Sequence, residues 1–285
     1  WISWFAHVVA GSLYAITLSK YTIHFLASFE MFDWLNVNLL MFEKSFAVLI
    51  ALIFIYINYR GASETGNVGA IMSIGQTIVL AVIGLIGVVV AIKSPGKLAN
   101  FDPFLSGGWS KVLVVMGFSL VGYEGYEVIA NTAEEVVDAK KNVPKGIFYA
   151  VMIVITTYLL VAFATIIGVK SADMSLVEWF QARGATGFAD AIAMLFPFGG
   201  VLVILSVIFA STSALNATIY SSARVSFALG RDGYLPKYFA HISSNTRTPD
   251  IALACSGAIT IIIAAVFPVE VVCAGASIFF IILFN

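Results

Sequence analysis

The sequence predicts an all-helical integral membrane protein, and three observations support this fold class. Of the 285 residues, 60% are hydrophobic and only 11% are charged, and the mean hydropathy is +0.98, whereas a soluble domain carries about 25% charged residues. Eight apolar runs approach the roughly 20 residues that a helix needs to span a bilayer. None of them alternates with the period of two that a membrane β-barrel requires.

The expected spans follow one another with short polar connections. They cover residues 1–26, 43–59, 68–92, 112–131, 146–169, 199–223, 250–267 and 270–285. A loop with Glu30 and Asp33 precedes the second span, and the polar turn 58–67 separates the second from the third. Prolines stand at or outside the span ends, where a missing N–H costs least. The chain opens inside one apolar run and stops after another, so we expect a fragment truncated at both ends.

The positive charges give a modest orientation signal. Loops after the second, fourth and sixth spans hold eight Lys and Arg residues, against six on the other side. Because an excess of Lys and Arg marks the cytoplasmic side, Trp1 is expected near the cytoplasm. The net charge of −1 argues against nucleic acid as a partner.

The stretch 116–135, MGFSLVGYEGYEVIANTAEE, interrupts the fourth span. Gly122 and Gly125 weaken the helix, because glycine is about 1 kcal/mol worse than alanine in a helix interior. Glu124 and Glu127 lie at membrane depth, where a charge costs roughly 2.5–3.5 kcal/mol. A broken helix with acids at this depth is typical of a secondary transporter's substrate site. The alternative is an ordinary glycine-containing helix packed closely on a neighbour.

Four motifs in order resemble the amino acid–polyamine–organocation permeases. They are GYEGYEVIANTAEEVVDAKKNVPKGI at 122–147, STSALNATIYSSARVSFALGRDGYLP at 211–236, NYRGASE at 58–64 and TPDIAL at 248–253. The resemblance implies that the eight spans are helices three to ten of a leucine-transporter-like fold, with two inverted five-helix repeats and the first two helices missing. It also implies a single transmembrane transporter domain over 1–285, placed in the cell membrane as a multi-pass protein.

The broken helix is the predicted substrate site. Carbonyls left without helical partners near Phe118–Val121 carry partial negative charge and suit an ammonium group, and in the resembling family an aromatic residue at the position of Phe118 covers the substrate. The alternative for Phe118 is a core or lipid-facing side chain. The candidate substrate-binding residues are Phe118, Ser119, Val121, Gly122, Tyr123 and Thr218.

The coupling ion is less closely defined. Two buried acids three residues apart repel, so Glu124 or Glu127 can stay protonated near neutral pH and carry a proton. Some relatives carry a lysine where this chain has Gln76, which cannot titrate. Ser211 and Thr212 are candidate ligands for sodium in place of a proton. The alternatives are a Glu124 that only braces the break, a solvated Glu127, and hydroxyls that only pack helices.

These residues together predict a secondary transporter of amino acids or related amines that works by alternating access, with proton coupling favoured over sodium symport or exchange. The expected partners are the small-molecule substrate, the lipid bilayer and H⁺ or Na⁺. We find no nucleophile–base pair, HExxH motif or metal cluster, so neither an enzyme nor a cofactor is expected. Cys255 and Cys273 are interpreted as buried thiols. A channel and an inactive fragment remain alternatives.

Overall fold

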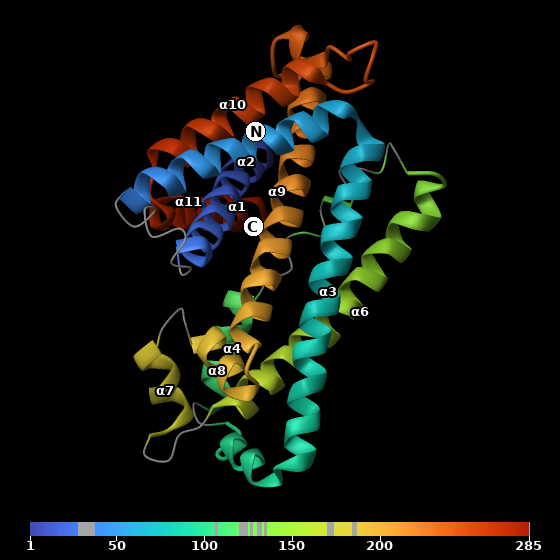
Figure 1. Ribbon diagram of the computed structural model, residues 1–285. Coiled ribbons are helices and arrows are strands. Elements are labelled where there is room, and N and C mark those ends of the chain that lie inside the picture. The colour runs from blue at the N-terminus through green and yellow to red at the C-terminus, as the bar shows by residue number, and fades with distance from the viewer. Residues whose placement is uncertain are drawn as a thin grey trace. The chain divides into compact units, whose positions relative to one another are not determined.

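The computed structural model describes residues 1–27, 38–105, 108–119, 125, 128–129, 133, 136–169, 174–183 and 187–284. In these residues the secondary structure is helical (Figure 1). The helices are α1 (Ile2–Ala27), α2 (Leu39–Arg60), α3 (Ala62–Lys93), η2 (Pro95–Phe101), α4 (Gly108–Ser119), α6 (Ala139–Gly168), α7 (Leu176–Arg183), α8 (Gly187–Leu195), α9 (Gly199–Arg231), η6 (Lys237–Ala240), α10 (Asp250–Val266) and α11 (Val269–Phe284).

The helices confirm the predicted fold class. Among the described residues, α1, α2, α3, α6 and α9 are long and apolar enough to cross a membrane, and α10 and α11 are shorter apolar helices. Each of these seven coincides with one predicted span. The fourth predicted span, 112–131, is described as helix α4 only as far as Ser119. The break predicted within 116–135 lies largely outside the described residues. The inverted repeat and the orientation remain predictions.

Two helices extend well beyond the apolar runs that predicted them. The helix expected from residue 146 begins at Ala139 and contains Pro144. Its start is stabilised by the carbonyl of Asp138, which accepts hydrogen bonds from the N–H groups of residues 141 and 142, each at 3.0 Å. Hydropathy locates only the apolar middle of such a helix, because a charged first turn lowers the average without breaking the backbone hydrogen bonds.

Helix α9 continues eight residues past its predicted end to Arg231 and closes in a Schellman motif. Gly233 adopts φ +82°, the left-handed conformation that glycine tolerates best. The N–H of Tyr234 bonds the carbonyl of Leu229 at 2.8 Å, and the N–H of Gly233 bonds that of Gly230 at 3.4 Å. The GRDG sequence is therefore a helix stop.

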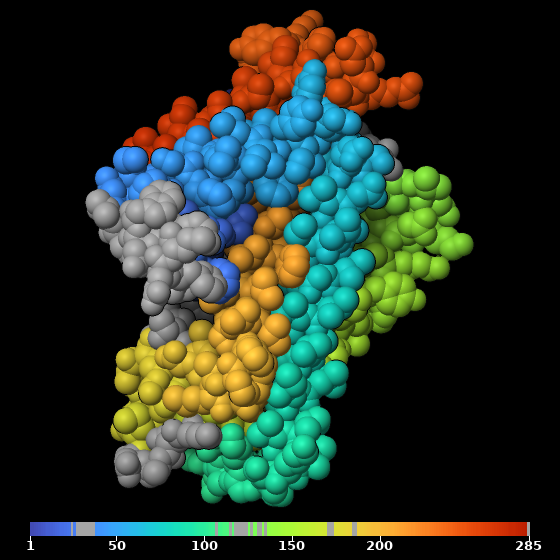
Figure 2. All heavy atoms as spheres, in the orientation of Figure 1, coloured from blue at the N-terminus to red at the C-terminus, as the bar shows by residue number. Residues whose placement is uncertain are grey.

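Two compact units divide the chain, and each is described separately. The first unit comprises residues 1–73, 124–144 and 207–285. In it α1 packs against α2, α10 and α11, and α2 packs against α10 (Figure 1). Figure 2 shows the atoms of α2 and α10 in direct contact. One apolar core joins α1, α2, α9 and α10 and contains Leu18, Phe54, Leu215, Ile219 and Leu253.

The second unit comprises residues 74–123 and 145–206 and depends on small residues at helix contacts. A Cβ added at Gly84 would lie 2.6 Å from Leu160 Cβ, and one added at Gly87 would lie 2.6 Å from Ala164 Cα. Helices α3 and α6 therefore approach more closely than any side chain at these glycines allows, which is typical of membrane helix pairs. Trp179 of α7 is 2% exposed and packs against Val169 and Ala191.

Candidate functional site

The candidate ion ligands Ser211 and Thr212 lie on α9 and are buried, with 6% and 8% of their surfaces exposed. Neither hydroxyl has a hydrogen-bond partner in the described part of the chain. Most other polar side chains on this helix are bonded, so these two oxygens differ from their neighbours. An oxygen without a protein partner is available to a water molecule, a cation or a substrate.

Thr218, the candidate substrate residue on the same helix, directs its hydroxyl back to its own backbone. Its Oγ1 donates to the carbonyls of Ala214, at 2.9 Å, and Leu215, at 3.0 Å. A Cβ added at Gly11 of α1 would lie 3.2 Å from this oxygen, so α1 passes close to it. The hydroxyl proton is thus occupied, and only the oxygen lone pairs remain for a ligand.

Sequence reasoning did not single out the amide side chain of Asn216, which ties α9 to two other helices. Asn58 Nδ2 donates to Asn216 Oδ1 at 3.0 Å, and Asn216 Nδ2 donates to the carbonyl of Thr65 at 2.9 Å. One turn earlier, Ser213 shares a hydrogen bond of 2.7 Å with Ser73 of α3. The signal was present, because Asn58 and Asn216 each lie in a family motif and in or beside an apolar span.

A second set of hydroxyls joins α1, α9 and α10. Trp4 Nε1 donates to Ser256 Oγ at 2.8 Å, and Ser256 Oγ lies 3.2 Å from Ser226 Oγ. Ser12 Oγ donates to the carbonyl of Thr260 at 3.0 Å. His7 of α1 is also buried, and its Nδ1 donates to the carbonyl of Ser3 at 2.7 Å.

The remaining candidates belong to the second unit or lie outside the described residues. Gln76 is half-buried on α3 in the second unit. Phe118 and Ser119 end α4, and their side chains are outside the described part of the structure. The candidates Val121, Gly122, Tyr123, Glu124 and Glu127 are also outside it. Among the described residues, no group of three His, Cys, Asp or Glu side chains could hold a metal.

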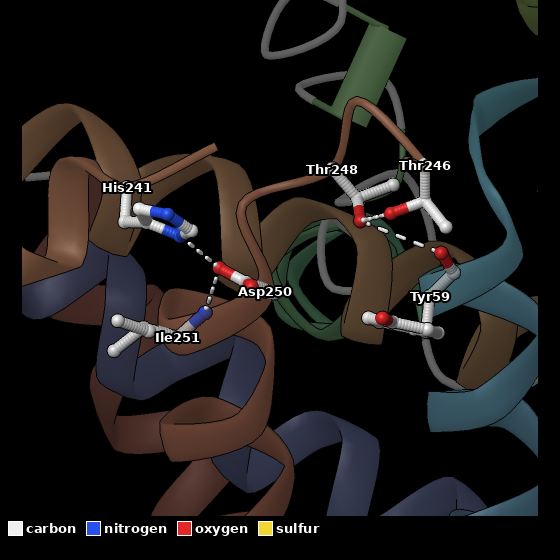
Figure 3. A network of polar contacts seen from close by, with 6 residues as sticks. All are labelled: Tyr59, His241, Thr246, Thr248, Asp250 and Ile251. Atoms are coloured by element: carbon white, nitrogen blue, oxygen red, sulfur yellow. Dashed lines mark hydrogen bonds and ion pairs between the residues drawn. The ribbon is translucent and has the colours of Figure 1, made fainter. Parts of the chain in front are cut away.

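Polar contacts hold the segment 241–250, which leads into α10 (Figure 3). His241 Nδ1 lies 2.7 Å from Asp250 Oδ1, and the same oxygen accepts the N–H of Ile251 at 2.8 Å. Thr246 and Thr248 share a hydrogen bond of 2.7 Å. Thr248 also reaches the carbonyl of Tyr59, at 3.4 Å. The TPDIAL motif therefore begins α10 and connects it to the end of α2.

The long apolar helices and the polar side chains buried between them define a multi-pass membrane protein. The profile of the amino acid permease family matches residues 1–284. The chain therefore belongs to the amino acid permease family, which confirms the resemblance in the motifs. The family is one of transporters, in agreement with the expectation that the chain is not an enzyme.

Three curated relatives illustrate the range of the similarity. A methylthioribose transporter of Bacillus subtilis is 27% identical over 73% of this chain and 42% of its own length. A branched-chain amino acid permease of the same organism is 26% identical over 79% of this chain and 46% of its own. A low-affinity putrescine importer of Escherichia coli is 26% identical over 76% of this chain and 48% of its own. The chain spans about half the length of these relatives.

Proposed function

We propose that the natural full-length protein is a secondary transporter that carries amino acids or related amines across the cell membrane by alternating access. The observation that carries this proposal is the family match over residues 1–284. The named substrates of two relatives, branched-chain amino acids and putrescine, both contain amino groups. The hydroxyls of Ser211 and Thr212, two buried residues of the apolar helix α9, have no partner among the described residues and add possible oxygen ligands.

The substrate's ammonium group is assigned to the helix carbonyls near Phe118–Val121, with Phe118 covering it. An aromatic face attracts a cation by roughly 0.5–2 kcal/mol. Phe118→Ala should therefore weaken substrate binding much more than it lowers the yield of folded protein. Phe148→Ala, which removes an exposed aromatic ring of α6, is the matched control and should leave affinity unchanged. Equal affinity in Phe118→Ala and wild type would remove Phe118 from the site.

The coupling ion is proposed to be a proton carried by Glu124, with Glu127 as the second choice. Gln76 occupies the position at which some relatives have a lysine, and its amide does not titrate near neutral pH. A proton must therefore bind elsewhere, and a carboxyl group at membrane depth is favoured in its neutral form. Under this proposal Glu124→Gln abolishes the pH dependence of transport, and Gln76→Leu preserves it.

Sodium coupling is the second candidate, because the buried residues Ser211 and Thr212 offer two hydroxyl oxygens that bond no described residue. Hard cations prefer oxygen ligands. Under this alternative, the conservative changes Ser211→Ala and Thr212→Val raise the sodium concentration needed for half-maximal transport. Exchange of one substrate for another, without any ion, would leave transport insensitive to both cations.

The deciding experiment is uptake into proteoliposomes that contain the natural full-length protein. The labelled panel includes branched-chain and cationic amino acids, putrescine and methylthioribose, and sodium and pH are varied separately. Uptake of an amino compound, driven by a pH gradient without sodium, supports the proposal. An absolute sodium requirement would replace the proton with sodium. Uptake of methylthioribose alone would refute the proposed substrate class.

A further inference from the structure

Two buried asparagines form a chain of amides between α9 and the corner where α2 meets α3. Asn58 is 4% exposed and Asn216 is 3% exposed. Asn58 Nδ2 donates to the carbonyl of Phe54 at 2.8 Å and to Asn216 Oδ1 at 3.0 Å. Asn216 Nδ2 then donates to the carbonyl of Thr65 at 2.9 Å. All of these residues belong to the first unit.

The direction of this chain is determined at both ends. The carbonyls of Phe54 and Thr65 can only accept, so each amide must present its Nδ2 to them, and neither side chain can be flipped. This arrangement leaves Asn58 Oδ1 buried and without a partner among the described residues. A buried acceptor without a partner costs about 1–3 kcal/mol. An apolar side chain of similar size at position 58 would avoid that cost.

The hydrogen-bonded amides of Asn58 and Asn216 set the rotation of α9 about its axis. Asn216 contacts the corner through Thr65, whose N–H and Oγ1 both bond the carbonyl of Gly61. A Cβ added at Gly69 would lie 3.3 Å from Asn216 Nδ2, so α3 lies close beside it. A turn of α9 by one residue, about 100°, would break the bonds to Asn58 and Thr65.

The same rotation places the candidate site. Thr212 precedes Asn216 by four residues and therefore lies on the same side of α9, one turn away. Ser211 and Thr218, seven residues apart, share another side of the helix, about 140–160° around its axis from Asn216. We infer that Asn58 and Asn216 are positioning residues: their hydrogen bond holds α9 in the rotation at which these three side chains serve the transported substrate and ion. This inference rests on the proposed function.

The transport test compares Asn58→Leu, Asn216→Leu and the double variant with a matched structural control. Ser12→Ala removes a buried hydrogen bond between α1 and α10 in the same unit without touching the amide chain. We expect Asn58→Leu to raise KM about tenfold, the factor that corresponds to about 1.4 kcal/mol. Its Vmax per folded molecule should stay near that of Ser12→Ala. The KM increases of the two single variants should not add in the double variant, because both single changes remove the same hydrogen bond between Asn58 and Asn216.

Thiol labelling measures the rotation of α9 without any substrate. In a cysteine-free background, Thr212→Cys is labelled with a soluble thiol reagent, with and without Asn58→Leu. We expect the labelling rate to change at least threefold with Asn58→Leu and to stay unchanged with Ser12→Ala. If the wild type transports substrate and both leucine variants keep its KM, the inference is overturned. A labelling rate of Thr212→Cys that does not change with Asn58→Leu would also overturn it. If no substrate is transported, the proposed function fails, and the labelling rate decides the inference alone.

Discussion

Replacing Gly87 by alanine tests a close contact between two long helices of the second unit, α3 and α6. The added Cβ would lie 2.6 Å from Ala164 Cα and closer still to Ala164 Cβ, whereas ordinary contacts begin at 3.4 Å, so α3 and α6 must separate by at least about 0.8 Å. Overpacking of this kind costs about 1–3 kcal/mol. Alanine also returns about 1 kcal/mol through its better helix propensity, so the variant should be less stable than wild type by about 0–2 kcal/mol.

Gly66→Ala is the matched control, because it lies in the same helix with nothing within 4 Å of the added Cβ. This variant receives the propensity gain without the clash. The two variants should therefore differ by the overpacking term, about 1–3 kcal/mol. Unfolding in detergent micelles titrated with sodium dodecyl sulfate, followed by circular dichroism, gives both values. Ala164→Gly should recover part of the loss in Gly87→Ala. A Gly87→Ala variant as stable as Gly66→Ala would refute the close contact of α3 with α6.

Two further predictions concern charged groups. Lys44 of α2 donates hydrogen bonds from its Nζ to two carbonyls at the end of α10, so Lys44→Met should lower the free energy of unfolding by about 1–3 kcal/mol. The control Lys237→Met, at an exposed lysine, should change it by less than about 0.5 kcal/mol. Equal effects of the two changes would contradict the capping role of Lys44. The N–H and hydroxyl of Ser175 bond the Glu178 carboxylate and lower its pKa. The ionised Glu178 therefore stabilises α7 fully above the unfolded-state pKa of glutamate, about 4.3. This stabilisation is lost as the pH falls through the lower pKa of Glu178 in the folded protein. Amide exchange in α7 should report this pH dependence, and Glu178→Gln should abolish it.

The helices were predictable because membrane spans need about 20 apolar residues and little else. Their ends were not. Helix α6 begins at Ala139 and α9 ends at Arg231, in both cases beyond the apolar run. The end of α9 was encoded by Gly233, which ends it in a Schellman motif, and the GRDG sequence contained this information. Hydropathy averages such a position with its neighbours and cannot detect it.

The candidate site was predictable only as a set of residue types. A run of hydroxyls at membrane depth indicated Ser211 and Thr212, and both are buried. The partner of Asn216 was not predictable from local pattern, because Asn58 lies 158 residues away along the chain. A side-chain pair of this separation depends on how whole helices pack. The acids of the proposed coupling site lie outside the described residues, and their roles remain predictions.

The arrangement around α9 connects these observations to the choice of ion. Its apolar side, with Leu215 and Ile219, is fixed in the core of the first unit, and its amide side is fixed by Asn216. Two independent attachments allow only one rotation of the helix in this packing. In that rotation the side chains of Ser211 and Thr212 are buried, and their hydroxyls have no hydrogen-bond partner among the described residues. Because both attachments hold the helix in this rotation, a species that binds these oxygens meets a pre-organised site and need not reorder the helix.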